Sequence, residues 1–192
     1  MDSKGSGKLR VTIKRLALAV TIGFACSACQ ISESHHQAIE VTGFSDVIKH
    51  WNDQNHRDPQ PRYALHQIRL IADNIVRYQR ANGGWPENIN PLRILSEQEI
   101  ARQAALYSAT DTSFDNRNVY PQIRYLAEAY QQTHDENYQQ AVIRGLRFIL
   151  SAQLANGGFT HSPPSTERYY GHITIMDDVM AGVLGLLQEI KL

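Results

Sequence analysis

Two pairs of neighbouring residues with side-chain oxygens, and one histidine, have types and spacing that could do chemistry. Asp115-Asn116 lies in a polar stretch, Asp177-Asp178 stands directly before an apolar segment, and His172 comes shortly before that second pair. Carboxylate and amide oxygens are donors that a hard cation takes as ligands, and a histidine can hold or transfer a proton. Each residue also has an ordinary structural explanation, as a helix cap, an Asx turn or a hydrogen-bonded histidine. Taken singly, these residues favour the structural explanation.

Apolar residues at three- and four-residue steps predict amphipathic helices that would position these candidates. The clearest stripe consists of Leu65, Ile68, Ile71, Ala72, Ile75 and Val76, and its helix should end at Asn82-Gly83-Gly84. The other expected helices cover residues 96–107, 121–131, 138–152 and 180–192, with one short helix over 44–51. No convincing pair of strands accompanies them. The sequence therefore predicts an all-α fold, either a bundle, a solenoid or an α/α toroid.

Local signals indicate where two of these helices begin. Ser96 can accept a hydrogen bond from the third helical amide while Glu99 reaches back, and Leu95 can pack on Ile100 as a staple. Pro121 suits a first helical turn, because a proline has no N–H and the first amides of a helix have no helical partner. We therefore expect helices to start at Ser96 and near Pro121.

An internal repeat selects among the helical architectures. The segment QRANGGW at 79–85 is echoed by QLANGGF at 153–159, each at the end of an amphipathic helix. In both, the glutamine can bond the backbone at the turn, the two glycines allow the reversal, and the aromatic side chain fills the gap toward the next hairpin. Coincidence is the alternative, and the shared helical context argues against it. Two helices that end in the same turn imply a repeated structural unit, so the repeat favours an α/α toroid of helical hairpins.

Size and charge bound the class of protein. The chain has 192 residues, with 19 Lys plus Arg and 19 Asp plus Glu. That length fits one ordinary domain, and a balanced charge gives no field that would steer the protein toward nucleic acid or an anionic membrane. We therefore expect no nucleic-acid partner, and a ligand has to be inferred from local chemistry.

The amino terminus is typical of an exported protein. Basic residues between Lys4 and Arg15 precede the apolar run 16–25, which is shorter than the roughly 20 residues that span a bilayer. We interpret residues 1–29 as a signal peptide, and the small residues before Cys29 resemble a lipoprotein cleavage motif. The expected location is the periplasm, the envelope through a lipid anchor at Cys29, or the medium after simple cleavage. Apart from such an anchor, we expect no membrane contact.

The rest of the chain divides by composition into two parts. Residues 30–62 are polar and rich in histidine, and we interpret them as a linker and lead-in. Residues 63–192 carry the main helical stripes and form the expected domain.

Three segments together resemble the pectate lyases of polysaccharide lyase family ten. They are NIVRYQRANGGWPENI at 74–89, FDNRNVYPQIRYLAEAY at 114–130 and YYGHITIMDDVM at 169–180, in the family's order and spacing. The resemblance runs from about Tyr63 to the final leucine. It implies that residues 63–192 are part of an (α/α)₃ toroid, whose loops between hairpins form a groove for polygalacturonate.

The resemblance also implies a site. Asp115 matches an acidic residue of the family's T-I-D-N segment, and Asp177 matches the aspartate of its H-x-T-F-N-D segment. By this resemblance Asp115 and Asp177 are the ligands of a calcium ion, and Asn116, His172 and Asp178 contact the substrate. The implied reaction is a β-elimination that cleaves polygalacturonate in pectin.

Several departures from the family pattern bear on activity. The family's catalytic arginine lies beyond the position of Leu192, so the catalytic residue of this chain is unknown and the toroid is expected to be incomplete. Glu87 replaces a lysine, Arg117-Asn118 replaces a Gly-Ala pair, and Met176 replaces an asparagine. Residues 160–163 and Gly171 also differ from the family pattern.

These observations leave two functions open. One is a lyase-type protein, with weak activity or none, that uses calcium to act on polygalacturonate. The other is a non-catalytic exported protein that binds an acidic oligosaccharide, or a structural relic of such an enzyme. Retained binding without turnover would distinguish the second from the first.

Overall fold

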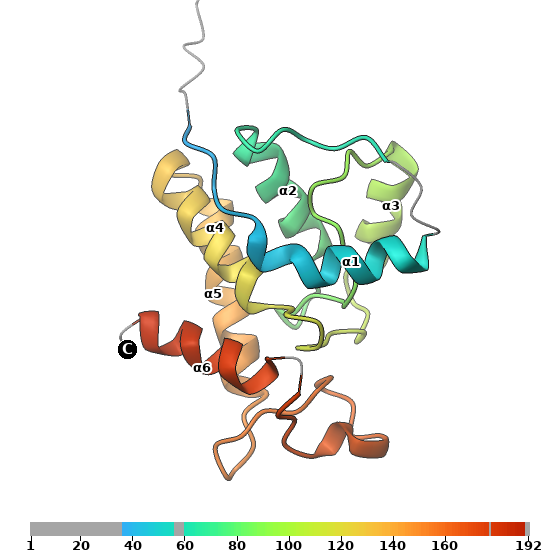
Figure 1. Cartoon of the computed structure of the whole chain (residues 1–192), viewed down its shortest axis with the longest axis vertical. Helices are drawn as coiled ribbons and strands as arrows, with labels where there is room; N and C mark the ends of the chain where they lie inside the picture. Colours follow the sequence, from blue (N-terminus) through green and yellow to red (C-terminus); the bar gives the residue numbers. More distant parts are fainter. Residues whose placement is uncertain (1–35, 56–59, 177, 191–192) are drawn as a thin grey trace, which may run out of the picture. The chain divides into compact units, whose positions relative to one another are not determined.

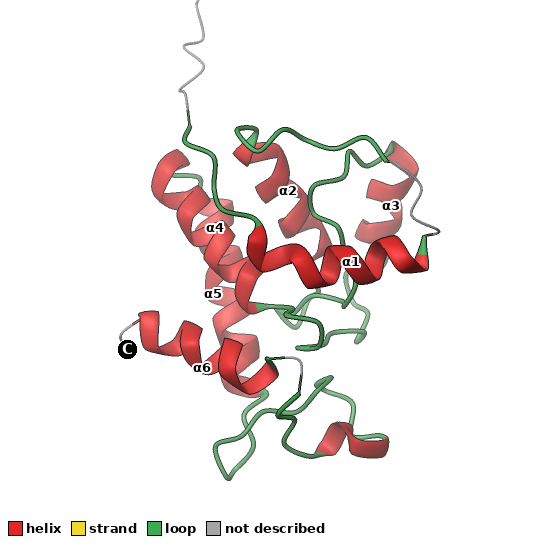
Figure 2. Cartoon of the chain, viewed as in Figure 1, coloured by secondary structure: helices red, strands yellow, loops and turns green. Residues whose placement is uncertain are grey.

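Helices of moderate length account for nearly all regular structure in a computed structural model of the chain, which describes residues 36–55, 60–176 and 178–190. Within these ranges the α-helices are α1 (Ser45–Gln54), α2 (Ile68–Tyr78), α3 (Glu97–Ala105), α4 (Tyr120–Thr133), α5 (Glu136–Ser151) and α6 (Val179–Ile190). Two 3₁₀ turns, η1 (Thr42–Phe44) and η2 (Arg168–Gly171), complete the list. The described ranges contain isolated β-bridges but no strand, so the prediction of an all-α fold is confirmed (Figures 1 and 2).

The antiparallel hairpin of α4 and α5 is the centre of the packing. These two helices make the most extensive contact of any pair, and α2 packs against both of them (Figure 1). Helix α3 packs on α2, and α6 packs on α4. Ile75, Trp85 and Leu126 lie in the single buried cluster that these elements share, and each is fully buried.

The lead-in segment before residue 63 contributes to the same core. Ile39, Phe44 and Val47 are buried within the shared cluster, and Phe44 packs against Tyr125 with ring centroids 5.8 Å apart. The short helix expected over 44–51 is therefore present as α1. Its Val47 side chain, and Phe44 directly before the helix, pack on the helical domain.

Most helix limits agree with the sequence signals, but both ends of α2 differ from the expectation. The helix ends at Tyr78, before the expected Asn82-Gly83-Gly84, and Gln79 has extended backbone with ψ of 132°. Ser96 and Glu99 form a capping box, in which the Ser96 hydroxyl accepts from the Glu99 amide and the Glu99 carboxylate accepts from the Ser96 amide. Pro121 lies in the first turn of α4, as expected. Leu65, in contrast, precedes α2 and is exposed, so its assignment to the buried stripe was wrong. The Ala64 amide instead donates to the Gln67 side chain, which forms a turn before the helix.

The repeated segments form the same turn twice, which confirms the interpretation of the repeat. Gln79 Nε2 donates to the Gly83 carbonyl at 2.9 Å, and in the second copy Gln153 Nε2 donates to the Gly157 carbonyl at 3.0 Å. Both glycines adopt positive φ, 93° and 85°. The aromatic residues that follow, Trp85 and Phe159, are fully buried. Both turns therefore reverse the chain and bury an aromatic side chain directly afterwards.

The buried tyrosines make the fold sensitive to alkali. Burial, with the Asp178 charge as the next cause, raises the pKa of Tyr120 to about 12. Burial also raises the pKa of Tyr125, and burial together with a hydrogen bond to Asp73 raises that of Tyr138. Tyrosines of the unfolded chain ionise near pH 10, so the unfolded state loses protons first. This contribution to stability is complete below about pH 10 and is lost as the pH rises through the folded pKa values.

We therefore expect the urea midpoint of unfolding to be lower at about pH 11 than at about pH 9, with tyrosinate absorbance appearing together with unfolding. Tyr125→Phe should reduce this pH dependence, because the variant has one buried phenol fewer. A midpoint that stays constant over this range would contradict the prediction.

Two sequence predictions concern residues outside the described ranges. The signal peptide over 1–29 and the lipid anchor at Cys29 both lie there. Within the described ranges, none of the helices is long and apolar enough to cross a bilayer.

Candidate functional site

Asp115 lies in the loop between α3 and α4, and only one of its two carboxylate oxygens has a partner in the described part of the chain. The Asp115 amide donates to the Ser113 hydroxyl at 3.0 Å, which fixes the backbone of the loop. Asp115 Oδ2 lies 3.0 Å from Nε2 of His161. Asp115 Oδ1 is buried and has no hydrogen-bond partner in the described part of the chain. A buried carboxylate oxygen without a partner is costly, so its presence indicates either strain or a ligand.

His161 is the member of this site that the sequence did not reveal. Its ring is buried, its Nδ1 lies 2.6 Å from Ser162 Oγ, and it stacks on Tyr170 with ring centroids 4.8 Å apart. The His161 carbonyl also accepts from the Phe114 amide at 2.8 Å. These contacts orient the imidazole toward Asp115. One signal in the sequence could have identified it. His161 follows the second copy of the repeat, and Asp115 lies downstream of the first copy, so the two matching turns bring these segments side by side.

Asn116 joins the loop to the segment that follows the first repeat. Its amide donates to Asn88 Oδ1 at 2.8 Å, and both residues have left-handed backbone, with φ of 54° and 58°. Asparagine tolerates this region better than most residues. Arg117, the next residue, is also left-handed with φ of 58°, where a glycine would be more comfortable.

Asn118 is the hydrogen-bonding centre of the loop. The residue is fully buried, and its amide nitrogen donates to the carbonyls of Trp85 at 2.9 Å, Ser113 at 2.8 Å and Pro86 at 3.2 Å. Its side-chain oxygen accepts from Gln122 in the first turn of α4. One asparagine therefore ties together the turn after the first repeat, the Asp115 loop and the start of α4.

The loop ends in a strained turn. Val119 has φ of 78° and ψ of −59°, and the Tyr120 amide donates across it to the Asn118 carbonyl at 3.1 Å. This three-residue γ-turn is rare, and positive φ is unfavourable for a β-branched residue. Such strain costs on the order of 1–3 kcal/mol and is found most often at functional sites, where the surroundings enforce it.

An ion pair connects the Asp115 loop to the start of α6. Arg117 Nη2 lies 2.7 Å from Asp178 Oδ2, and both side chains are about half exposed. An exposed pair of this kind contributes at most about 1 kcal/mol. It nevertheless places the residue next to Asp177 beside the loop that carries Asp115. Asp177 itself lies outside the described residues.

His172 is the candidate with the fewest contacts. Its side chain is exposed, and its backbone amide donates to the Tyr169 carbonyl at 3.0 Å. No hydrogen bond or ion pair within the described ranges links His172 to Asp115, Asn116 or Asp178. The structure thus connects Asp115, Asn116 and Asp178 through neighbouring residues. His172 takes no part in these contacts.

The residues present offer only part of a calcium shell. No group of three or more His, Cys, Asp or Glu side chains suited to a metal ion occurs in the described ranges. Asp115 Oδ1 fits a cation ligand, because the other oxygen of that carboxylate is held by His161, as ligating carboxylates commonly are. Asp178 is engaged by Arg117. Calcium takes six to eight oxygen ligands, so further donors would have to come from Asp177 or a bound molecule.

Comparison with known proteins assigns the class and then the family. A solved structure of a family 10 polysaccharide lyase from Cellvibrio cellulosa shares the fold, with a TM-score of 0.51, 21% identity and coverage of 81% of this chain and 42% of that chain. The described helices therefore belong to the α/α toroid class. The family described as pectic acid lyase matches residues 79–192, which is more than half of the chain. The chain belongs to this family.

Two further results complete the comparison. An alanine-for-aspartate mutant of the family 10 lyase from Cellvibrio cellulosa, in complex with trigalacturonic acid, has a TM-score of 0.48 and 25% identity, and covers 61% of this chain and 34% of that chain. None of the curated proteins matches. The chain spans less than half the length of the two solved structures that it resembles.

Proposed function

We propose that this protein is an exported, pectate-lyase-like protein that binds polygalacturonate, or a related acidic polysaccharide, at the loop containing Asp115. The observation that carries the proposal is the Asp115 carboxylate. One of its oxygens is held by His161, and the other is buried without a partner in the described chain. Membership of the pectic acid lyase family and the strained backbone at Arg117 and Val119 support the same location.

Calcium is the proposed cofactor, with Asp115 and Asp177 as its ligands. When bound, calcium would neutralise a galacturonate carboxylate and make the neighbouring C5 proton more acidic, which is the difficulty of a β-elimination on this substrate. His161 would hold Asp115 Oδ2 and leave Oδ1 directed at the ion. Asp178 and Asn116 lie where they could accept or donate hydrogen bonds to sugar hydroxyls, as could His172 from its exposed position.

The charge on Arg117 favours an acidic ligand at the same place. Its guanidinium is about half exposed and needs only to exchange Asp178 for a substrate carboxylate, a partner of the same chemistry. Arg117 would therefore orient a uronate group against the loop. We assign the base that removes the C5 proton to no residue of this chain.

The decisive test compares Asp115→Asn with Glu128→Gln, because each variant removes one carboxylate. Glu128 is exposed on α4, outside the loop and the residues bonded to it. We expect calcium-dependent binding of oligogalacturonate, measured by calorimetry, to weaken by about tenfold or more in Asp115→Asn and to stay unchanged in Glu128→Gln. A chelator should weaken binding to the wild-type protein by a similar factor. Equal affinity in the two variants would refute the proposed site.

Turnover is measured separately from binding. Incubation with polygalacturonate and calcium should give little or no ultraviolet-absorbing unsaturated product, beside a longer family member as positive control. Substantial product that disappears in Asp115→Asn would establish a lyase. The second function is a non-catalytic protein that binds an acidic oligosaccharide. Binding without turnover would establish that function.

A further inference from the structure

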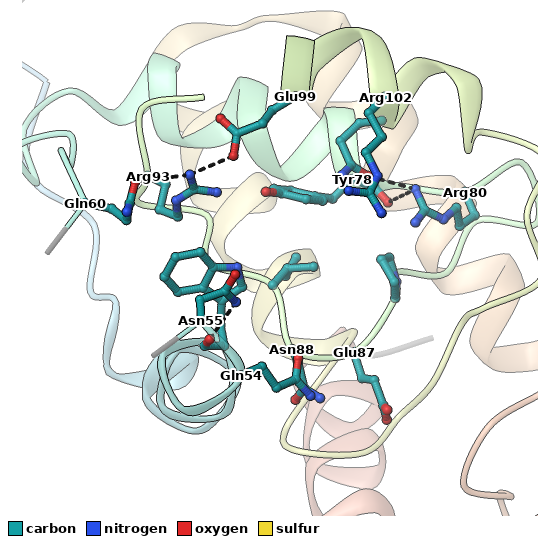
Figure 3. Close-up of a pocket in the computed structure, with 14 residues that line it drawn as sticks. Gln54, Asn55, Gln60, Tyr78, Arg80, Glu87, Asn88, Arg93, Glu99 and Arg102 are labelled. Carbon is teal, nitrogen blue, oxygen red and sulfur yellow. Dashed lines mark hydrogen bonds and ion pairs between the residues drawn. The ribbon is translucent and has the colours of Figure 1, made fainter. Parts of the chain in front are cut away.

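A cavity of about 570 Å³ lies between α1 and α3, on residues that the proposed calcium site does not use. This volume falls in the range of small-molecule sites. Helix α1 contributes Trp51 and Gln54, and α3 contributes Glu99 and Arg102 (Figure 3). Asn88 also lines the cavity and bonds Asn116, so the cavity adjoins the Asp115 loop.

Arg93 is the first observation that indicates a ligand in this cavity. Its side chain is about nine-tenths buried, its Nη2 lies 2.7 Å from Glu99, and its guanidinium carbon lies 4.6 Å from the centroid of the Trp51 ring. Its Nε is buried and has no hydrogen-bond partner within the described residues. A buried guanidinium donor without an acceptor costs the hydrogen bond that it would make with water in the unfolded chain. An oxygen acceptor bound in the cavity would remove that cost.

The balance of charge identifies the sign of that acceptor. Arg80 is fully buried and satisfied by Asp111, with contacts of 2.7 Å and 2.9 Å. Arg102 has no ion-pair partner in the described chain. Glu87 also lines the cavity, but its carboxylate points away from the arginines (Figure 3). Arg93 is already paired with Glu99, so the unpaired positive charge at this cavity is that of Arg102, and an anionic group would be favoured beside it.

The other lining residues identify the rest of the ligand. Amide side chains that can donate to and accept from hydroxyl groups surround the cavity, and Trp51 and Ile89 offer apolar surface to the C–H face of a ring. The amides are those of Gln54, Asn55, Gln60, Asn88 and Gln103. A ring with several hydroxyl groups and one carboxylate matches this lining, because an arginine pairs well with a carboxylate and the amides pair with hydroxyls.

We propose that this cavity is a second saccharide site, which binds one sugar unit that bears a carboxylate, with Arg93 and Arg102 on the carboxylate and the amides on the hydroxyls. Helix α1 precedes residues 79–192, the part of the chain that matches the family, so this site depends on the lead-in segment. The inference rests on the proposed function only for the choice of galacturonate as the probe. The lining itself supplies the chemistry of the ligand.

Tryptophan fluorescence provides the test, because the chain has two tryptophans, and Trp85 is fully buried in the core. We expect galacturonate to change the emission of the full chain, and Trp51→Phe to abolish that change. Arg102→Gln should weaken binding about tenfold, because it removes one charged contact to the carboxylate. Arg147→Gln is the control, since Arg147 is an exposed arginine on α5 that does not line the cavity. Arg102 is exposed, so its variant should fold, which circular dichroism would verify.

Two comparisons separate this proposal from the one concerning Asp115. Asp115→Asn should leave the fluorescence response intact, so the cavity can bind galacturonate even if the calcium site fails its own test. Galactose, which lacks the carboxylate, should bind at least about tenfold more weakly than galacturonate. The proposal is overturned if Arg102→Gln binds as tightly as Arg147→Gln, if the two sugars bind equally, or if galacturonate leaves the emission unchanged.

Discussion

Gly83→Ala should lower the free energy of unfolding by about 3 kcal/mol or more. Gly83 has φ of 93°, a conformation that costs an alanine about 1–2 kcal/mol. In addition, a Cβ built at this position would collide with the backbone carbonyl of Arg144 in α5. Backbone cannot rotate away as a side chain can, so α5 would have to move from the turn. Gln79 donates to the carbonyls of Gly83 and Ala141, and both hydrogen bonds would be distorted.

The second copy of the repeat provides the matched control. Gly157 has φ of 85°, but a Cβ there would meet no atom within 4 Å. Gly157→Ala therefore carries only the backbone cost and should destabilise by about 1–2 kcal/mol. Urea unfolding of both variants measures the difference. Equal losses would show that the contact with Arg144 relaxes at little cost and that α5 is held less firmly than the structure indicates.

This pair of glycines shows how far the sequence could predict the fold. The two Gln-to-aromatic segments predicted two identical turns, because the local hydrogen bonds depend only on residues within each segment. The difference between the turns depends on Arg144, which lies in α5 and is distant from Gly83 in sequence. A local pattern could not predict that approach. The prediction for Leu65 was wrong for a related reason. Its spacing from the next apolar residues fits a helix, but the helix begins only at Ile68.

The candidate site was predictable in part. Asp115 and Asn116 were identified through the resemblance to a family, and the structure places both in a strained loop bonded to the segment that follows the first repeat. His161 was missed because it is one histidine among eight, with no spacing that connects it to Asp115. The link between Arg117 and Asp178 was missed because a local reading assigns an aspartate before a helix to its cap.

The cavity beneath α1 was the least predictable feature. The sequence indicated a short helix in the lead-in, but nothing indicated which of its residues would line a cavity together with residues of α3. Trp51 and Arg93 come together only when the segment between α2 and α3 folds back against α1. Their distance in the sequence carries no periodic signal. A pocket formed by such long-range contacts can be recognised only in the three-dimensional structure.

Asn118→Ala should be as damaging as Gly83→Ala, for a different physical reason. Asn118 is fully buried, and its amide donates to the carbonyls of Trp85, Pro86 and Ser113. An alanine would remove one partner from each of these carbonyls and from the Gln122 amide, which donates to Asn118. These groups are buried, so water could not replace the lost partner. Each buried group left unsatisfied costs about 1–3 kcal/mol, so we expect a loss of about 3 kcal/mol or more in urea unfolding.

Asn156→Ala is the control for this variant, because Asn156 also bonds the backbone through its side chain but is exposed. Water can replace that bond, so the loss should be below about 1 kcal/mol. The comparison also tests whether the loop of Asp115 depends on Asn118 for its shape. Measured where Asn118→Ala is still folded, oligogalacturonate affinity should fall along with stability, whereas Asp115→Asn should lower affinity with little change in stability. Normal affinity in folded Asn118→Ala would mean that the strained loop keeps its shape without its central asparagine.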